Sequence, residues 1–149
     1  MTFEYSNFVR CTKDEAWELI SNIERRPEWI HFQEKCYWLD KQPCMVGSTY
    51  QEVEVFLGFH INVKYEVTAW EPYRKMTSFT KMPPFHQTVE VFMEERADGC
   101  FTKLLIHADM GILGLLPKFI IKNKVNELVN PMVDVFIDIL ESNSVLKNK

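Results

Sequence analysis

The sequence predicts an α+β domain in which a curved antiparallel sheet of six to seven strands encloses one long C-terminal helix. Two observations carry this prediction. Apolar and polar residues alternate with period two over much of residues 32–110, and a stripe with the 3.6-residue period of a helix follows from 117 to 140. Strands and helices are therefore segregated along the chain, as in α+β domains. Because twisted strands curl, the long helix can close the open side of the sheet.

The length and composition are those of one ordinary globular domain. The chain has 149 residues, of which 46% are hydrophobic and 26% are charged. It shows no repeat and no linker, so we expect a single domain over residues 1–149, with a frayed polar tail at 142–149. The net charge of −4 gives the chain no general electrostatic attraction to nucleic acid.

Targeting signals and cysteine spacing favour the cytoplasm. The first ten residues lack the basic and apolar regions of a signal peptide. The most apolar stretch, 111–121, has about half of the roughly 20 residues that a membrane span needs. We expect it to be a loop that leads into a buried helix, and a lid or a lipid-contacting surface is the alternative. The cysteines form no C-x-x-C pair, which predicts free thiols in a reducing compartment and no zinc site.

The first part of the chain predicts one strand and two short helices. Residues 3–9 are rich in aromatic side chains, as is typical of a strand. Thr12 and Glu15 have the spacing of a capping box, in which the Thr12 hydroxyl accepts a hydrogen bond from the backbone N–H of Glu15. A helix should begin there, and a second helical turn should follow around residues 27–30.

The middle of the chain predicts strands with one buried face each. Alternation is clearest from 59 to 70, where apolar residues occupy every odd position. In the preceding strand the same parity places Val53 and Val55 on the buried face and Glu52 and Glu54 on the opposite face. The expected strands are 32–40, 49–57, 59–70, 76–82, 85–94 and 102–110.

The C-terminal segment predicts one long amphipathic helix. Its apolar stripe runs from 117 to 140, which corresponds to about 36 Å at a rise of 1.5 Å per residue. Pro131 removes one backbone hydrogen bond and should kink the helix near residues 127–130.

Several short segments, taken in their order along the chain, carry a family likeness. They are the strand-to-helix opening at 9–22, Pro27-Glu28-Trp29, Val46-Gly47-Ser48, Val67-Thr68-Ala69-Trp70-Glu71-Pro72, and Asp98-Gly99 followed by Thr102-Lys103-Leu104. With them the chain resembles the START-like, birch-pollen-allergen-like (SRPBCC) superfamily, and within it the polyketide cyclase/dehydrase-like group. It departs from the pattern at Thr12, where family members often have Pro, and in the longer spacing after Gly99.

The resemblance implies the helix-grip fold, with a hydrophobic cavity between the sheet and the long helix. It implies less about activity, because the family includes lipid and hormone carriers, quinone binders, cyclases, dehydratases and co-chaperone modules.

The inner faces of the predicted elements are almost entirely apolar. Such a pocket suits an apolar ligand that is held by buried area and oriented by a few hydrogen bonds. No titratable pair for acid–base catalysis falls on these faces, so the sequence predicts no catalytic residue, and it predicts no metal or cofactor. The candidate ligand-binding residues are Val53, Val55, Tyr65, Val67, Gln87, Val89, Val91, Leu104, Ile106, Phe119, Leu128, Met132 and Phe136.

Some side chains keep two interpretations. Tyr65 is either a core tyrosine or a ligand-orienting group, and Gln87 is either a buried amide or a surface residue. His31 lies near the expected cavity mouth and is a candidate for a functional role. The outer face should carry His60, His86 and His107, whose spacing fits no metal-ligand pattern.

Three residue groups could be structural or could mark a contact surface. The basic cluster near the start of the long helix is either a solvated face or a site for an anionic headgroup. An aromatic group either packs under the short helices or lines the cavity entrance. An outward apolar pair either packs across strands or marks a dimer surface. The basic cluster is Lys118, Lys122 and Lys124, and the outward apolar pair is Phe92 and Leu105. The aromatic group is Trp29, Phe32, Tyr37 and Trp38.

We therefore expect a cytoplasmic carrier or sensor that binds a small hydrophobic molecule such as a lipid, a quinone or a polyketide-like compound. It should be a monomer or a weak homodimer without stable membrane insertion. One alternative is a cyclase/dehydrase-type enzyme with Tyr65, Gln87 and His31 as proton-handling groups, which a buried charge on an inner face would favour. The other is a co-chaperone-like interaction module, which a filled, dry interior would favour.

Overall fold

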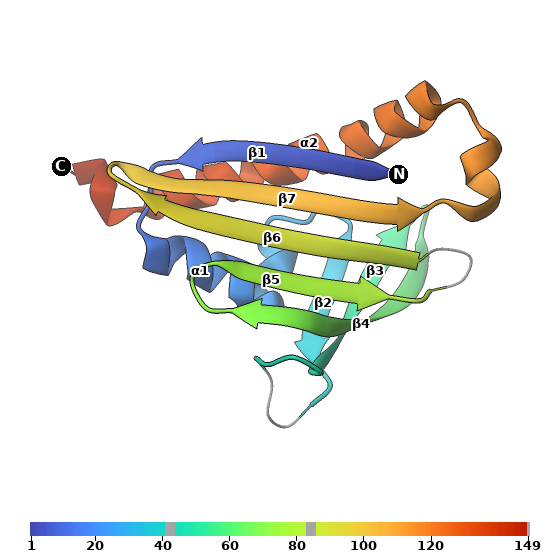
Figure 1. Cartoon of the computed structure of the whole chain (residues 1–149), viewed down its shortest axis with the longest axis horizontal. Coiled ribbons are helices and arrows are strands. Elements are labelled where there is room, and N and C mark those ends of the chain that lie inside the picture. The colour runs from blue at the N-terminus through green and yellow to red at the C-terminus, as the bar shows by residue number, and fades with distance from the viewer. Residues whose placement is uncertain (41–43, 83–85, 149) are drawn as a thin grey trace.

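A seven-stranded antiparallel sheet with the order β1-β7-β6-β5-β4-β3-β2 forms one layer of the structure (Figure 1). The structure is a computed structural model that describes residues 1–40, 44–82 and 86–148. This arrangement confirms the predicted α+β fold, and the predicted start of one strand at Phe85 lies outside the described residues. The strands are β1 (Thr2–Val9), β2 (Gln33–Trp38), β3 (Thr49–Phe56), β4 (Phe59–Glu71), β5 (Lys75–Thr80), β6 (His86–Arg96) and β7 (Gly99–Asp109).

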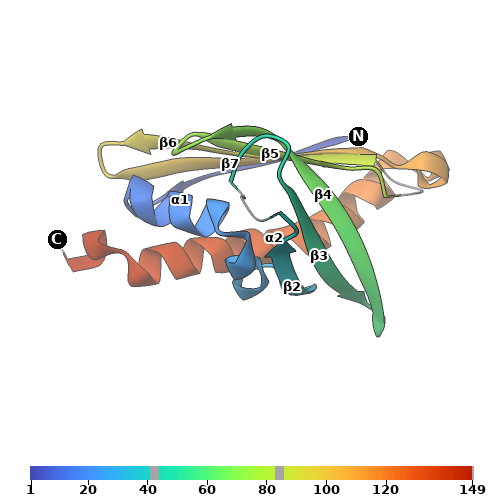
Figure 2. The same cartoon turned by 90° about the horizontal axis from the view of Figure 1, so that it is seen from below.

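The helices form the second layer, on the concave side of the sheet. Figure 2 shows α1 (Lys13–Ser21) and α2 (Lys118–Asn143) beneath the strands, while β2 and β3 curl around toward α2. The long helix runs through Pro131 without interruption. Short 3₁₀ helices complete the described chain: η1 (Ile23–Glu28), η2 (Gly111–Leu115) and η3 (Val145–Asn148).

The predicted capping box is present and also anchors the C-terminus. The backbone N–H of Thr12 donates to Glu15 Oε2 (2.8 Å), and the backbone N–H of Glu15 donates to Thr12 Oγ1 (3.2 Å). The Ser144 hydroxyl and the Val145 N–H also donate to the Glu15 carboxylate, at 2.7 and 3.0 Å. These bonds hold Ser144 and Val145 against α1, within the segment for which the sequence predicts a frayed tail.

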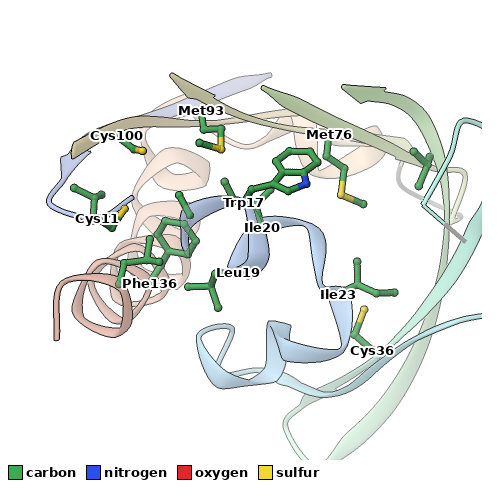
Figure 3. Packing of buried hydrophobic residues seen from close by; sticks show 14 of the residues in the cluster. Cys11, Trp17, Leu19, Ile20, Ile23, Cys36, Met76, Met93, Cys100 and Phe136 are labelled. Atoms are coloured by element: carbon green, nitrogen blue, oxygen red, sulfur yellow. The ribbon is translucent and has the colours of Figure 1, made fainter. Parts of the chain in front are cut away.

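The packed core lies toward the end of the sheet that α1 and the C-terminal half of α2 cover. Figure 3 shows Leu19 of α1 close to Phe136 of α2, and Ile23 of η1 close to Cys36 of β2. Leu19 and Ile23 are completely buried. The N-terminal half of α2 is packed less closely, and the space between it and the sheet is hollow.

The faces of β3 are the reverse of those predicted from the sequence. Tyr50 lies opposite Tyr65, and Glu54 lies opposite Ile61. Directly opposed residues of an antiparallel pair share a face, so the even positions of β3 join the odd positions of β4 on the concave side. The cause is the two-residue turn at Leu57 and Gly58, both of which have positive φ as in a type I′ hairpin. Because this turn has two residues, even positions of β3 pair with odd positions of β4. A prediction that keeps the odd positions on one face through the turn therefore assigns the wrong face to β3.

Candidate ligand-binding cavity

A cavity of about 440 Å³ lies between the concave face of the sheet and the N-terminal half of α2. Strands β3 to β7 form one wall, and α2 contributes Val125, Leu128, Val129 and Met132 to the other. The segment that links η1 to β2 closes the side with aromatic and aliphatic residues such as Trp29. The wall is mostly apolar because β4, β6 and β7 direct their alternate apolar positions inward.

Most of the predicted ligand-binding residues line this cavity. The sequence therefore predicted the correct inward face for β4, β6 and β7, and the correct inward stripe for α2. The residues concerned are Tyr65, Gln87, Val89, Val91, Leu104, Ile106, Leu128 and Met132.

The other predicted residues lie elsewhere, for separate reasons. Val53 and Val55 point to the outer face of β3 because of the hairpin turn. Val67 is fully buried in the packed core beyond the cavity. Phe119 lies in the first turn of α2 and is 67% exposed. Phe136 packs edge-on against Trp29 with ring centroids 5.1 Å apart, which places it beside the cavity and not in its wall.

A buried ion pair lies in the cavity wall, contrary to the expectation that no charge falls on an inner face. The Arg26 guanidinium of η1 donates to Glu52 Oε1 (2.7 Å) and to the Tyr50 hydroxyl (2.9 Å). Arg26 is 7% exposed and Glu52 is 4% exposed. The guanidinium also stacks over the Tyr50 ring at 4.8 Å. Buried charges are found in such paired and hydrogen-bonded arrangements because isolated ones are strongly disfavoured.

Glu54 is a second carboxyl in the same wall. It lies two residues from Glu52 on the same face of β3, and no described residue forms an ion pair with it. Burial, and then the neighbouring Glu52 carboxylate, raises the pKa of Glu54 from 4.5 to about 8. At neutral pH Glu54 is therefore mainly the neutral acid.

Tyr65 and Gln87 form a polar pair across the cavity wall. The Gln87 Nε2 donates to the Tyr65 hydroxyl at 3.3 Å. The Tyr65 ring stacks on Tyr50 with centroids 5.3 Å apart, which links it to the Arg26 cluster. Burial, and then the Glu52 charge, raises the pKa of Tyr65 well above its ordinary value. Tyr65 is therefore a hydrogen-bonding group at neutral pH and not a proton-releasing one.

Two other polar side chains of the wall have buried atoms without partners. Gln33 of β2 is 6% exposed, and its Oε1 accepts no hydrogen bond from the described residues. The Trp29 Nε1 donates to none of them. Unpaired buried polar atoms are rare in folded proteins and suggest a missing partner. The cavity wall contains both residues.

The remaining candidates lie outside the cavity wall. His31 is exposed and touches Phe32 edge-on at 5.4 Å. On the outer face, His60 Nδ1 lies 2.9 Å from Glu34 and His107 Nε2 lies 3.1 Å from Glu90. The described residues include no group of three or more side chains placed to hold a metal ion.

The aromatic group lies partly in the cavity wall and partly outside it, and the outward apolar pair lies on the outer face of β6 and β7. Trp29 and Phe32 line the cavity, whereas Trp38 packs on Tyr50 and Tyr37 is exposed. Phe92 lies opposite Lys103, and Leu105 lies opposite Glu90, so the apolar pair is diagonal and not directly opposed.

The segment before α2 and the first turn of α2 are exposed, although the sequence suggested a loop that leads into a buried helix. Ile112, Leu115 and Phe119 are 74%, 84% and 67% exposed, and the first buried residue of α2 is Ile121. The lysines at 118, 122 and 124 lie in the same part of α2 and are also exposed. In the described part of the chain, no helix is both long enough and apolar enough to cross a membrane.

Comparison with known families and structures agrees with this architecture. The family model described as "Polyketide cyclase / dehydrase and lipid transport" matches residues 1–144. No curated protein is similar enough in sequence to count as a match.

Solved structures with the same fold are distant in sequence. A START superfamily protein from Mycobacterium smegmatis has a TM-score of 0.78 at 11% identity, over 95% of this chain and 97% of that one. A major latex-like protein from Panax ginseng has a TM-score of 0.74 at 10% identity, over 94% of this chain and 97% of that one. The di-domain ARO/CYC StfQ of the steffimycin biosynthetic pathway has a TM-score of 0.76 at 14% identity, over 95% of this chain and 50% of that one. These likenesses confirm the helix-grip fold that the sequence resemblance implied.

Proposed function

The chain belongs to the polyketide cyclase/dehydrase and lipid transport family, and we propose that it binds a small hydrophobic molecule in its cavity as a carrier or sensor. The observation that carries this proposal is the cavity of about 440 Å³ with a mostly apolar wall. Ligand sites of small molecules commonly occupy about 300–1,000 Å³ and are lined by apolar residues with a few polar groups. Buried apolar area contributes about 25 cal/mol per Å² to the binding free energy.

The proposed binding residues are those of the predicted set that line the cavity. Val89, Val91, Leu104 and Ile106 supply apolar contact from neighbouring strands. The Tyr65–Gln87 pair supplies hydrogen-bonding groups on the same wall. Val53, Val55 and Phe119 are excluded from the proposed site because they do not reach it.

Native mass spectrometry of freshly purified protein tests this proposal, followed by extraction of any bound apolar molecule. We expect a defined adduct, or uptake of a molecule from a panel of lipids, quinones and aromatic polyketides. Val91→Trp should abolish binding by filling the cavity. The matched control is Thr88→Trp, on the opposite face of the same strand. Failure of the wild-type protein to bind any of these compounds would overturn the proposal.

A cyclase/dehydrase-type enzyme is the second candidate, and the buried charges of the wall favour it. Glu54 and the Arg26–Glu52 pair place an acid and fixed charges beside an apolar space. A carboxyl with a pKa near neutrality suits proton transfer, which typically contributes about 10²–10⁴-fold to a rate. Cyclised or dehydrated product from a poly-β-ketone substrate, lost in Glu54→Gln, would support this candidate. Unchanged substrate with the wild-type protein would count against it.

The other expectations receive unequal support. The hollow interior removes the condition that would have favoured a co-chaperone-like interaction module. A cytoplasmic location remains part of the proposal, supported by cysteines that are all free, with Cys11, Cys36 and Cys100 buried. We also propose a monomer or a weak homodimer, which size-exclusion chromatography with light scattering would test.

A further inference from the structure

The polar side chains of β2 and β3 form a distinct subsite within the cavity wall. Gln33 of β2 lies directly opposite Glu54 of β3 in the sheet register, and Glu52 lies two residues before Glu54 in β3. All three line the cavity. We refer to Gln33, Glu52 and Glu54 as the β2–β3 subsite.

The charge of this subsite is balanced while Glu54 is protonated, and it becomes unbalanced when Glu54 ionises. Arg26 from η1 bonds to Glu52 at 2.7 Å and neutralises it. The other titratable groups of the cavity wall are Tyr50 and Tyr65, which hold their protons at neutral pH. The walls from β6, β7 and α2 supply only Gln87 and apolar residues. Within the described residues, no cation is therefore left to pair with Glu54.

The hydrogen bonds of the subsite are also incomplete, and the missing partner is a donor. Gln33 is 6% exposed, and its Oε1 is an acceptor without a donor among the described residues. A carbonyl ligand could accept a bond from neutral Glu54, but it would leave the Gln33 oxygen unpaired. A hydroxyl has one proton to donate and carries no charge. An ammonium group has three protons to donate and also supplies a positive charge for the ionised form of Glu54.

We propose that the ligand is a hydrophobic amine whose ammonium group binds between the Glu54 carboxylate and the Gln33 carboxamide oxygen. This inference rests on the proposed binding function and specifies the ligand's chemistry. Phe32 and Phe56 stack at 5.3 Å beside the subsite, and aromatic faces attract cations. The apolar body of the amine extends along the wall of α2 and β7.

Binding of the ammonium requires Glu54 to release its proton to solvent. With a pKa of about 8 for Glu54 in the empty cavity, about nine-tenths of a proton should be released per amine at pH 7. The affinity should rise about tenfold from pH 6 to 7 and about fivefold from pH 7 to 8, because an alkylamine stays protonated in this range. A neutral ligand should show no such rise.

Three ligands with the same naphthyl body test the inference in the full-length protein. They are 2-(1-naphthyl)ethylamine, 2-(1-naphthyl)ethanol and 1-naphthylacetate, compared by titration calorimetry at pH 6, 7 and 8. We expect the amine to bind at least about tenfold more tightly than the alcohol at pH 8. Calorimetry in buffers of different ionisation enthalpy should detect the released proton.

Variants assign the effect to the subsite. Glu54→Gln should remove the pH dependence and reduce the amine's affinity to that of the alcohol, while alcohol binding is unchanged. Glu66→Gln, at an exposed position on the outer face of β4, is the control and should behave as the wild type. The pH profile of the wild-type protein tests the inference independently of any substitution.

The outcomes separate this inference from the proposed function. An alcohol or acid that binds as well as the amine, or an amine affinity that does not change with pH, overturns the amine inference and leaves hydrophobic binding intact. If none of the three naphthyl ligands binds, the amine inference also fails. The proposed function fails only if the lipid, quinone and polyketide panel gives no binding either.

Discussion

Glu54 makes the stability of the fold depend on pH. Burial and the Glu52 carboxylate raise its pKa from 4.5 to about 8, so the folded state holds a proton that the unfolded chain releases. The stabilisation is complete below pH 4.5 and is lost as the pH rises through 8. Glu54→Gln, which cannot ionise, should therefore raise the free energy of unfolding by about 1–3 kcal/mol at pH 8, after allowance for solvent screening.

Urea denaturation at pH 4.5 and pH 8 measures this effect. The variant and the wild type should differ little at pH 4.5, where both side chains are uncharged. The exposed control Glu66→Gln should show no such pH-dependent gain. A gain of equal size at both pH values would contradict the pKa shift.

Arg26 stabilises the buried negative charge of Glu52 in the cavity wall. Arg26→Met leaves Glu52 buried without a counterion and should lower the free energy of unfolding by about 3–5 kcal/mol. Glu52→Gln removes the charge in need of compensation, so the double variant should be more stable than the sum of the single changes predicts. A double-mutant cycle from urea denaturation at pH 7 measures the coupling. Additive effects would show that the pair does not act as a unit.

Single residues of the site were the hardest features to predict from the sequence. Periodicity alone could not assign Glu52 and Glu54 to the inner face, because valines and glutamates alternate in this strand and only the hairpin register decides between them. Leu57 and Gly58 carried the missing signal, since a two-residue turn fixes which positions oppose each other. Arg26 lies more than twenty residues before its partner, so only the tertiary fold reveals the ion pair.

At the scale of elements, the capping box joins the two ends of the chain. Glu15 accepts bonds from the N-terminus of α1 and from Ser144 and Val145. Burial raises its pKa, but the donors at Thr12, Val145 and Ser144 outweigh that effect and lower it overall. The stabilisation is therefore present above the unfolded pKa near 4.5 and is lost as the pH falls through the folded one.

Loss of this anchor should destabilise both helices. Glu15→Ala should lower the free energy of unfolding by about 1–2 kcal/mol at pH 7. Ser144→Ala should lower it by less and should have almost no further effect in the Glu15→Ala background. Asp14→Ala, at an exposed position of the same first turn, is the control for charge at the helix N-terminus. Thermal denaturation measures these differences, and additivity of the two changes would contradict a shared anchor.

Most elements were predictable because each has one strong local signal. The capping box marked the start of α1, and period-two alternation marked β4 with its correct inner face. The contact of Ser144 and Val145 with α1 was not predictable, because it depends on Glu15, a residue almost the whole chain away in sequence. The same limit applies to the exposed segment before α2, whose apolar composition alone suggested burial.

At the scale of the whole molecule, the curvature of the sheet and the length of α2 leave a space that side chains do not fill. The sequence and its family likeness predicted that a cavity would exist. Its volume of about 440 Å³ depends on the packing of wall residues from several strands and α2. No single segment of the sequence determines that packing. The packed core lies at the other end of the sheet, apart from this space.

A ligand in this cavity should therefore raise the melting temperature of the whole domain. A ligand that binds only the folded state adds about 2.7 kcal/mol to the free energy of unfolding at a concentration of 100 Kd. For a domain of this size, that corresponds to an increase of about 5–10 °C. Ile106→Trp should abolish the increase because Ile106 lines the cavity, whereas Leu105→Trp, on the opposite face of β7, should preserve it. Differential scanning fluorimetry makes the comparison, and an equal increase in both variants would place the ligand outside the cavity.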